Sequence, residues 1–311
     1  MGHILWLEPI FKEKIWGGNA LRDVYNYPIP SDKTGECWAI AAHQNGDCLI
    51  KEGKYQGVPL SRLFHEHTEL FGDIEGDVFP LLVKIIDAHD DLSIQVHPDD
   101  TYAKKYENSL GKTECWYVLE ASEEAHLIMG HNATTKEEFI KAIEQDDYDH
   151  LLRSVPIKKG DFFYIPAGTV HAICRGCLLY EAQQSSDVTY RLYDYHRKDD
   201  SGKERELHTR QSIDVTTIPY MPSTLETVTP EKIEDGMKTT LLSSPFFNVV
   251  KYDITGKMTF INTESFQMIS IVEGSGFVGE RKVIKGDHGI ICADQKKTKL
   301  EGNMRILMCS L

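Results

Sequence analysis

Short apolar runs separated by Gly, Asn and Asp recur along much of the chain. Runs of about four to eight residues between such turn formers are typical of β-strands. On this pattern we predict strands at residues 36–42, 80–87, 92–97, 115–119, 126–129, 162–166 and 178–183. Strands this short and this closely spaced predict a mainly β protein, built as a sandwich or a barrel.

Helical periodicity is confined to three stretches, residues 60–71, 98–107 and 134–153. The last of them opens with Thr134-Thr135-Lys136-Glu137-Glu138. A hydroxyl followed three residues later by a glutamate is the sequence pattern of a capping box. We therefore predict short helical pieces inserted into a β framework.

The C-terminal part of the chain resembles the part before it. Residues 267–275 align with 115–122, and Lys285-Gly-Asp aligns with Lys159-Gly-Asp. Self-similarity of this kind predicts a second copy of one β unit, here without the helical insertion. A Pro-, Ser- and Thr-rich stretch at 219–230 is typical of a connector. We predict a first unit at residues 1–220, which holds the candidate chemistry, and a second unit at 221–311.

Composition narrows the classes of partner. The formal net charge of −14 at pH 7 disfavours nonspecific binding to nucleic acid, and no block of Lys or Arg offsets it. No stretch approaches the roughly 18 uncharged residues of a membrane-spanning helix, and the first residues lack the pattern of a signal peptide. The seven cysteines are scattered, as expected of reduced thiols. We predict a cytoplasmic protein, in which an anionic substrate needs a few placed cations.

Three ligand-grade residues lie on predicted strands of the first unit. His171 follows the turn Pro166-Ala-Gly-Thr-Val, His97 belongs to Gln95-Val-His97, and Glu114 opens the run 115–119. Taken alone, each of these three residues could be a buried polar side chain with ordinary hydrogen-bond partners. Together, two imidazoles and a carboxylate on rigid strands predict a divalent-metal site of the catalytic type. Gln95 points to the same face as His97, so its amide oxygen is a candidate fourth ligand.

The second copy has lost these residues. It reads Cys292-Ala-Asp-Gln-Lys-Lys297 where the first copy reads Pro166-Ala-Gly-Thr-Val-His171. We therefore predict that the second unit is structural and that its His288 is an ordinary surface or turn histidine.

The spacing of the ligand residues resembles that of the cupins. Gly160-x5-Pro166-x-Gly168-x2-His171 matches the second cupin motif, with Arg175 where asparagine is usual, whereas the first motif is altered because the glutamate follows His97 by 17 residues. With Ile15-Trp-Gly-Gly18, the run 92–99, Gly111-Lys-Thr-Glu114 and Asp187-Val-Thr-Tyr-Arg191, the sequence is similar to the short bacterial branch of the type I mannose-6-phosphate isomerases. The resemblance extends over nearly the full length.

The resemblance implies a fold, a cofactor and a reaction. It implies two cupin-type β-barrel units with a short helical insertion, and isomerisation between mannose 6-phosphate and fructose 6-phosphate through an enediolate. It also implies one Zn²⁺ per chain and the following residues: Gln95, His97, Glu114 and His171 as ligands, Arg191 as the catalytic arginine, and Lys112, Glu181 and Asp187 in the pocket.

The residues themselves suggest roles within that frame. Lys112 lies in a donor-rich loop with Ser109, and both are candidates for binding the phosphate. Glu181 and Asp187 are the candidate bases, and the sequence does not choose between them; a lysine or a zinc-bound hydroxide is a further possibility.

Two other functions fit part of the pattern. Two histidines and a carboxylate on a β-barrel also describe mononuclear Fe(II) oxygenases, although the context of Gln95 and Arg191 is against that class. A non-catalytic sugar-phosphate-binding cupin is the second alternative. The presence of all four pocket residues, Lys112, Glu181, Asp187 and Arg191, argues against it.

Overall fold

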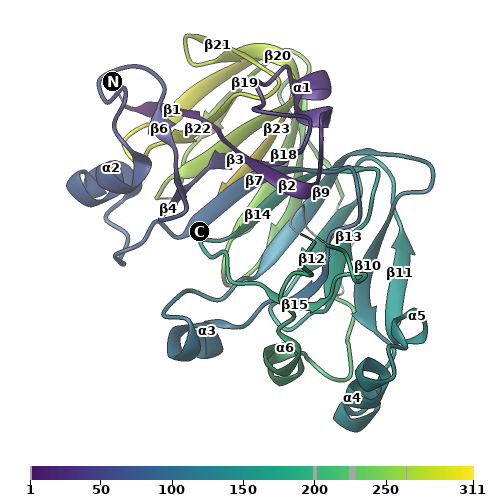
Figure 1. Ribbon diagram of the computed structural model, residues 1–311. Coiled ribbons are helices and arrows are strands. Elements are labelled where there is room, and N and C mark those ends of the chain that lie inside the picture. Colours follow the sequence, from purple (N-terminus) through teal and green to yellow (C-terminus); the bar gives the residue numbers. More distant parts are fainter. Residues whose placement is uncertain (1, 199–201, 224–228, 264) are drawn as a thin grey trace.

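The computed structural model describes residues 2–198, 202–223, 229–263 and 265–311, and the described chain is mainly β (Figure 1). A six-stranded sheet lies at the centre. Its strands, in spatial order, are β12 (Phe162–Ile165), β9 (Glu114–Ala121), β14 (Cys177–Gln184), β7 (Leu81–Ala88), β3 (Thr34–Ile40) and β2 (Ile10–Gly18). All neighbours in this sheet are antiparallel.

The four middle strands of the central sheet, β9, β14, β7 and β3, are buried along almost their whole length, which explains why they read largely as apolar runs. In β14, Tyr180 and Ala182 point into one hydrophobic cluster and Leu179 into another. Glu181 is two residues from Leu179, so the alternation of a strand turns it to the same face as Leu179. On this face the apolar layer gives way to charged side chains, and the candidate site begins there.

A five-stranded sheet covers that face (Figure 1). In spatial order its strands are β11 (Leu152–Pro156), β10 (His126–His131), β13 (His171–Ile173), β8 (Ile94–Val96) and β15 (Tyr190–Tyr193). Its outer face packs against short helices through an apolar cluster. The helices of the described chain are α1 (Ala20–Tyr25), α2 (Leu60–Glu66), a 3₁₀ turn at Thr68–Phe71, α3 (Asp100–Tyr106), α4 (Lys136–Glu144), α5 (Tyr148–Leu151) and α6 (Thr209–Val215).

A ten-stranded sheet packs on the other face of the central sheet and curls around a core of its own. Its main path is β16 (Glu231–Ile233), β17 (Gly236–Ser243), β18 (Asn248–Ile254), β23 (Lys297–Ser310), β20 (Gln267–Val278), β22 (His288–Ile291), β1 (Ile4–Glu8) and β6 (Leu49–Ile50). Strand β19 (Lys257–Ile261) pairs with β23, and β21 (Arg281–Ile284) with β20; the small strands β4 (Ala42–His43) and β5 (Gly46–Asp47) pair separately. The predicted mainly β architecture of two cupin-type units is confirmed.

The N-terminal residues contribute to the C-terminal sheet. Strand β1 pairs with β22, and β6 pairs with β1. The division into units at 1–220 and 221–311 stays a prediction. Strands β1 and β6 belong to the first range in sequence but to the sheet of the second range in space. Residues 224–228 of the expected connector lie outside the described residues.

Two sequence predictions need correction. The stretch 134–153 is not one helix, because the chain leaves α5 at Leu151 and residues 152–156 pair with β10 as strand β11. The capping at its start is confirmed, since the Glu138 amide donates to Thr135 Oγ1 at 3.2 Å. His288 is not a surface residue: it is 2% exposed and bonds to Tyr27 and Ser270.

Gly17, near the end of β2, lies close to the backbone at the start of β3. A Cβ there would stand 2.4 Å from Gly35 N and 2.5 Å from Lys33 O. Because backbone atoms cannot move aside as a flexible side chain does, we expect Gly17→Ala to lower the free energy of unfolding by about 3 kcal/mol in urea denaturation. Gly53→Ala is the control: its Cβ meets nothing within 4 Å at φ 86°, so we expect a loss of roughly 1 kcal/mol. Equal losses would contradict the packing argument.

Candidate metal centre and active site

Three ligand-grade side chains meet between the central sheet and the five-stranded sheet. His97 directly follows β8, Glu114 opens β9 and His171 opens β13. Their side chains are buried, and one ligand atom from each lies within 4.8 Å of the others. Among the described residues this is the one group of His, Cys, Asp and Glu with such geometry.

Backbone carbonyls orient both imidazoles toward this point. His97 Nδ1 lies 2.9 Å from Val188 O, and His171 Nδ1 lies 2.8 Å from Thr169 O. Because a carbonyl only accepts, each Nδ1 carries the proton and each Nε2 presents its lone pair to the site. Burial lowers the pKa of His171, and burial with the nearby Lys112 ammonium lowers the pKa of His97 to about 3. Both rings are therefore neutral, as metal ligands must be.

Glu114 supplies the negative charge of the site. Burial would raise the pKa of its carboxyl, but the Lys112 ammonium in contact with it outweighs burial and holds that pKa well below the usual value. The Lys112 ammonium contacts Glu114 Oε2 and lies 2.9 Å from His97 Nε2. Lys112, predicted in a phosphate-binding loop, is thus 4% exposed and beside the ligand residues.

The residues fit a divalent cation. Glu114 Oε1 has no hydrogen-bond donor and faces His171 Nε2, another acceptor, at 3.3 Å. A buried carboxylate oxygen without a donor is costly, and a cation that accepts electron pairs from Glu114 Oε1 and from the facing His171 Nε2 would satisfy it. The donor set of two imidazoles and a carboxylate suits Zn²⁺ and several other divalent ions.

Strand register places Gln95 at the same point. Gln95 is paired with His171 across β8 and β13 and with Arg191 across β8 and β15. Its amide nitrogen lies 3.3 Å from His171 Nε2. Since the two ends of an amide are assigned from their hydrogen bonds, the opposite orientation presents Oε1 to the site as a ligand.

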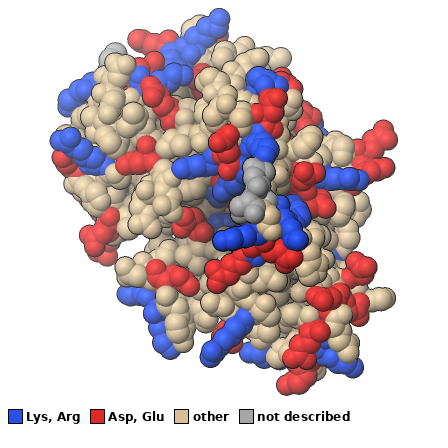
Figure 2. All heavy atoms as spheres, viewed as in Figure 1, with Lys and Arg blue, Asp and Glu red and all other residues tan. Residues whose placement is uncertain are grey.

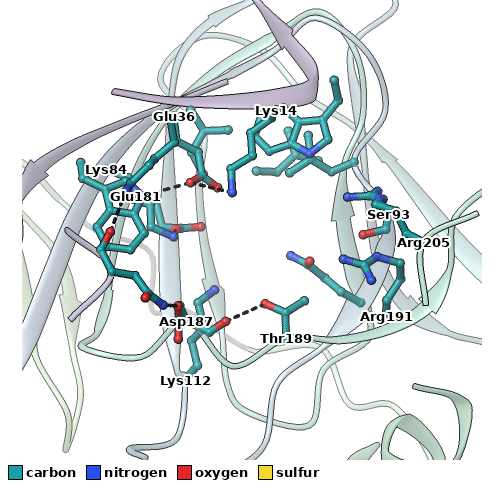
Figure 3. Close-up of a pocket in the computed structure, with 18 residues that line it drawn as sticks. Lys14, Glu36, Lys84, Ser93, Lys112, Glu181, Asp187, Thr189, Arg191 and Arg205 are labelled. Atoms are coloured by element: carbon teal, nitrogen blue, oxygen red, sulfur yellow. Dashed lines mark hydrogen bonds and ion pairs between the residues drawn. The ribbon is translucent and has the colours of Figure 1, made fainter. Parts of the chain in front are cut away.

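A cavity of about 480 Å³ opens beside these residues. Five residues predicted from the sequence line it: Gln95, Lys112, Glu181, Asp187 and Arg191 (Figure 3). Ser109 does not line it; its hydroxyl lies 3.3 Å from Ser186 Oγ. Figure 2 shows Lys and Arg side chains gathered around a hollow near the centre of one face, so local positive charge is present despite the net charge of −14.

Sequence reasoning missed much of the wall. The further polar and aromatic lining residues include Lys12, Lys14, Trp16, Glu36, Trp38, Lys84, Ser93 and Arg205. Part of this set had a signal: Lys12, Lys14 and Trp16 alternate along β2, and Glu36 and Trp38 alternate along β3, as side chains on one face of a strand do. Arg205 carried no such pattern.

The two carboxylates predicted as bases have different surroundings. Glu181 is 3% exposed; its Oε1 lies 3.0 Å from the Lys84 ammonium and its Oε2 accepts from Trp116 Nε1 at 2.8 Å. Asp187 has a side chain 36% exposed at the pocket, where it accepts from Asn45 Nδ2 and lies 3.6 Å from His43 Nε2. The structure therefore brings both to the pocket, Glu181 within a buried ion pair and Asp187 at an accessible position.

The fold and the site together define a metal-binding cupin. Residues 4–135 match "Phosphomannose isomerase type I, catalytic domain" and residues 237–311 match "Mannose-6-phosphate isomerase, cupin domain". The chain is 50% identical to the mannose-6-phosphate isomerase ManA of Bacillus subtilis, over 99% of this chain and 98% of the relative. It belongs to the type I mannose-6-phosphate isomerase family.

Further comparisons agree. The chain is 48% identical to the mannose-6-phosphate isomerase of Streptococcus mutans, over 99% and 98% of the two chains. A crystal structure of the mannose 6-phosphate isomerase from Bacillus subtilis superposes with a TM-score of 0.97 at 43% identity, covering both chains fully. A putative mannosephosphate isomerase from Archaeoglobus fulgidus, with a TM-score of 0.77 at 19% identity over 100% of this chain and 98% of that one, shares the fold. Among the described residues, no helix is long and apolar enough to cross a membrane.

Proposed function

We propose that the protein interconverts mannose 6-phosphate and fructose 6-phosphate. The observation that carries this proposal is the full-length identity of 50% to a mannose-6-phosphate isomerase. The site supports it, because a buried set of metal-binding residues stands beside a cation-lined cavity of about 480 Å³. Such a cavity suits a small anion rather than a polymer.

The reaction moves a proton between C2 and C1 and exchanges a carbonyl with a hydroxyl. Its enediolate carries negative charge, which needs cations or donors fixed in advance. We propose one Zn²⁺ held by Gln95, His97, Glu114 and His171, which as a Lewis acid would stabilise negative charge on the sugar oxygens. Lys112 contacts the ligand residues, so we place its contact with the substrate at the reacting end of the sugar.

Arg191 is the proposed catalytic arginine. Its guanidinium lines the cavity, and Nη1 donates to Glu206 O at 2.7 Å. Burial and the neighbouring Arg205 lower the pKa of Arg191 from its ordinary value, but a guanidinium stays charged at neutral pH. A permanent charge with several donors can stabilise the enediolate or hold an oxygen of the phosphate.

For the base we favour Asp187 over Glu181. A carboxylate that transfers a proton must reach the substrate carbon, and Asp187 is accessible from the cavity. Glu181 also lines the cavity, but it is 3% exposed and ion-paired with Lys84, so we assign it to fixing the charge and position of Lys84 and keep it as the alternative base. A cytoplasmic location and the absence of nucleic-acid partners stay predictions.

A coupled assay tests the function. We expect mannose 6-phosphate to be converted to fructose 6-phosphate, and activity to be lost on chelation and regained when zinc is added back. Binding of the sugar phosphate without turnover under any divalent metal would instead support the binding-protein alternative. Oxygen consumption with an iron-loaded protein would support the oxygenase.

A further inference from the structure

Two arginines converge on one buried carboxylate beside the cavity. Asp194 is 4% exposed. Arg205 binds it at both oxygens, with Nε 2.7 Å from Oδ2 and Nη2 2.6 Å from Oδ1. Arg197 reaches the same carboxylate through Nη2 at 2.5 Å. A two-point contact of this kind fixes the plane of a guanidinium as well as its position.

The two arginines differ in what else they reach. Arg205 lines the cavity, whereas Arg197 is not among its lining residues and donates through Nη1 to Asp91 O. The hydrogen bonds described for Arg205 use Nε and Nη2, which leaves Nη1 for a ligand. Asp194 therefore holds Arg205 against the cavity with donor capacity left over.

Arg191 stands on the same side of the cavity. In Figure 3 the side chains of Arg191 and Arg205 lie together near Ser93, away from Lys84 and Glu181. Arg191 Nε is buried and has no hydrogen-bond partner in the described structure. The positive charges of the two guanidiniums repel each other, and the negative charge of the buried Asp194 carboxylate offsets this repulsion. Arg197 binds the same carboxylate, and the exposed Glu206 adds a further negative charge near Arg191.

The opposite side of the cavity is closer to electrical balance. Lys14 lies 3.2 Å from Glu36, and Lys84 lies 3.0 Å from Glu181. Lys12 donates to Asn45 O at 2.6 Å and lies over the Trp38 ring. Each ammonium there already has an acceptor or a ring, so an anion gains less on that wall than beside Arg191 and Arg205.

We propose that Arg205 and Arg191 form the subsite for the phosphoryl group, and that Asp194 is a positioning residue that aims Arg205 into it. This inference rests on the proposed function. A phosphate monoester carries about −1.5 to −2 charge at pH 7 and three acceptor oxygens, which match the planar donors of two guanidiniums. The sugar then extends from this wall toward the metal-binding residues.

Binding measurements test the subsite independently of turnover. By calorimetry we expect Arg205→Ala to weaken binding of mannose 6-phosphate and of inorganic phosphate by about 10- to 100-fold each, as loss of a charged hydrogen bond predicts. In the coupled assay the KM should rise by a similar factor while kcat changes less than about threefold. If the unmodified protein showed no turnover, the proposed function would be rejected. The comparison of binding affinities would still show whether Arg205 contacts the phosphoryl group.

Asp194 is tested through its coupling to Arg205. We expect Asp194→Asn to weaken phosphate binding in the unmodified chain, but to have no further effect when Arg205 is already alanine, because the carboxylate acts through that guanidinium. A purely structural role would instead make the two effects add. Arg197→Ala is the matched control: it removes the other partner of Asp194 and should leave the affinity for phosphate within about twofold.

Two results would overturn the proposal. One is unchanged affinity in a folded Arg205→Ala protein. The other is a loss of affinity in Lys14→Ala with none in Arg205→Ala, which would place the phosphoryl group on the lysine wall. If Arg205→Ala does not fold, Arg205→Lys, which keeps the charge but not the two-point contact, should still weaken phosphate binding several-fold, and unchanged affinity in that variant would also reject the proposal.

Discussion

Replacing His171 with alanine is expected to remove bound metal and turnover together, with kcat lowered at least about 10³-fold. The imidazole is fully buried, its Nδ1 is fixed by Thr169 O, and its Nε2 faces Glu114 at 3.3 Å. Alanine removes a ligand that no neighbouring side chain replaces among those described at the site. A bound divalent ion supplies several kcal/mol of charge stabilisation to an enediolate, and each 1.36 kcal/mol is a factor of ten in rate.

Metal analysis of the purified protein measures its metal content, and the coupled assay measures its kcat. His150→Ala is the control, because His150 has a side chain 87% exposed and lies outside the site. It should retain both metal and activity. An active His171→Ala protein without metal would reject the metal-centred mechanism while leaving the family assignment intact. Retention of metal with loss of activity would show that Gln95, His97 and Glu114 suffice to bind the ion.

The residues of the candidate metal centre could be predicted from the sequence because each stands in a local pattern. His171 follows a Pro/Gly turn, Gln95 and His97 alternate on one strand, and Glu114 opens an apolar run. Short-range rules of strand alternation and turn chemistry give these positions. The resemblance then joined them into one site, and the structure brings His97, Glu114 and His171 within 4.8 Å.

The rest of the pocket depends on strand register, which the sequence does not carry locally. Lys84 meets Glu181 because β7 and β14 pair with those two residues opposite each other. A lysine within the apolar run 80–87 gives no hint of that partner. Arg205 lies beyond β15 and reaches the cavity through Asp194, a contact between loop residues without periodicity. His288 was misassigned for the same reason, since its partner Tyr27 lies 261 residues away in the chain.

The charges of Lys84, Glu181 and Glu36 are buried together at the pocket. Lys84 is 6% exposed and Glu181 is 3% exposed. Burial lowers the pKa of Lys84, but Glu181 and Glu36 outweigh burial and raise it. We expect Lys84→Met to lower the free energy of unfolding by about 3–5 kcal/mol at pH 7, because it leaves two buried carboxylates without their shared cation.

The loss should depend on pH through Glu36. Burial alone would raise the pKa of Glu36, but Lys84, followed by Lys14, brings it to about 2 from its ordinary 4.5. A carboxyl with a lowered pKa adds stability above its ordinary pKa, and that stability is lost as the pH falls toward the folded value. Without Lys84, the pKa of Glu36 rises, so the carboxyl takes up a proton at a higher pH than in the unmodified protein. The difference between the variant and the unmodified protein should therefore shrink as the pH falls below about 4.5.

Urea denaturation at neutral pH and near pH 4 measures both effects. Lys14→Met is the matched control: Lys14 also pairs with Glu36, but its side chain is 36% exposed. An ion pair with an exposed partner contributes about 0–1 kcal/mol, so the control should lose far less stability. Equal losses in the two variants would mean that burial does not set the strength of the Lys84 interactions. If the loss of unfolding free energy were the same at pH 4 as at neutral pH, protonation of the carboxylates would not be what relieves the absence of Lys84.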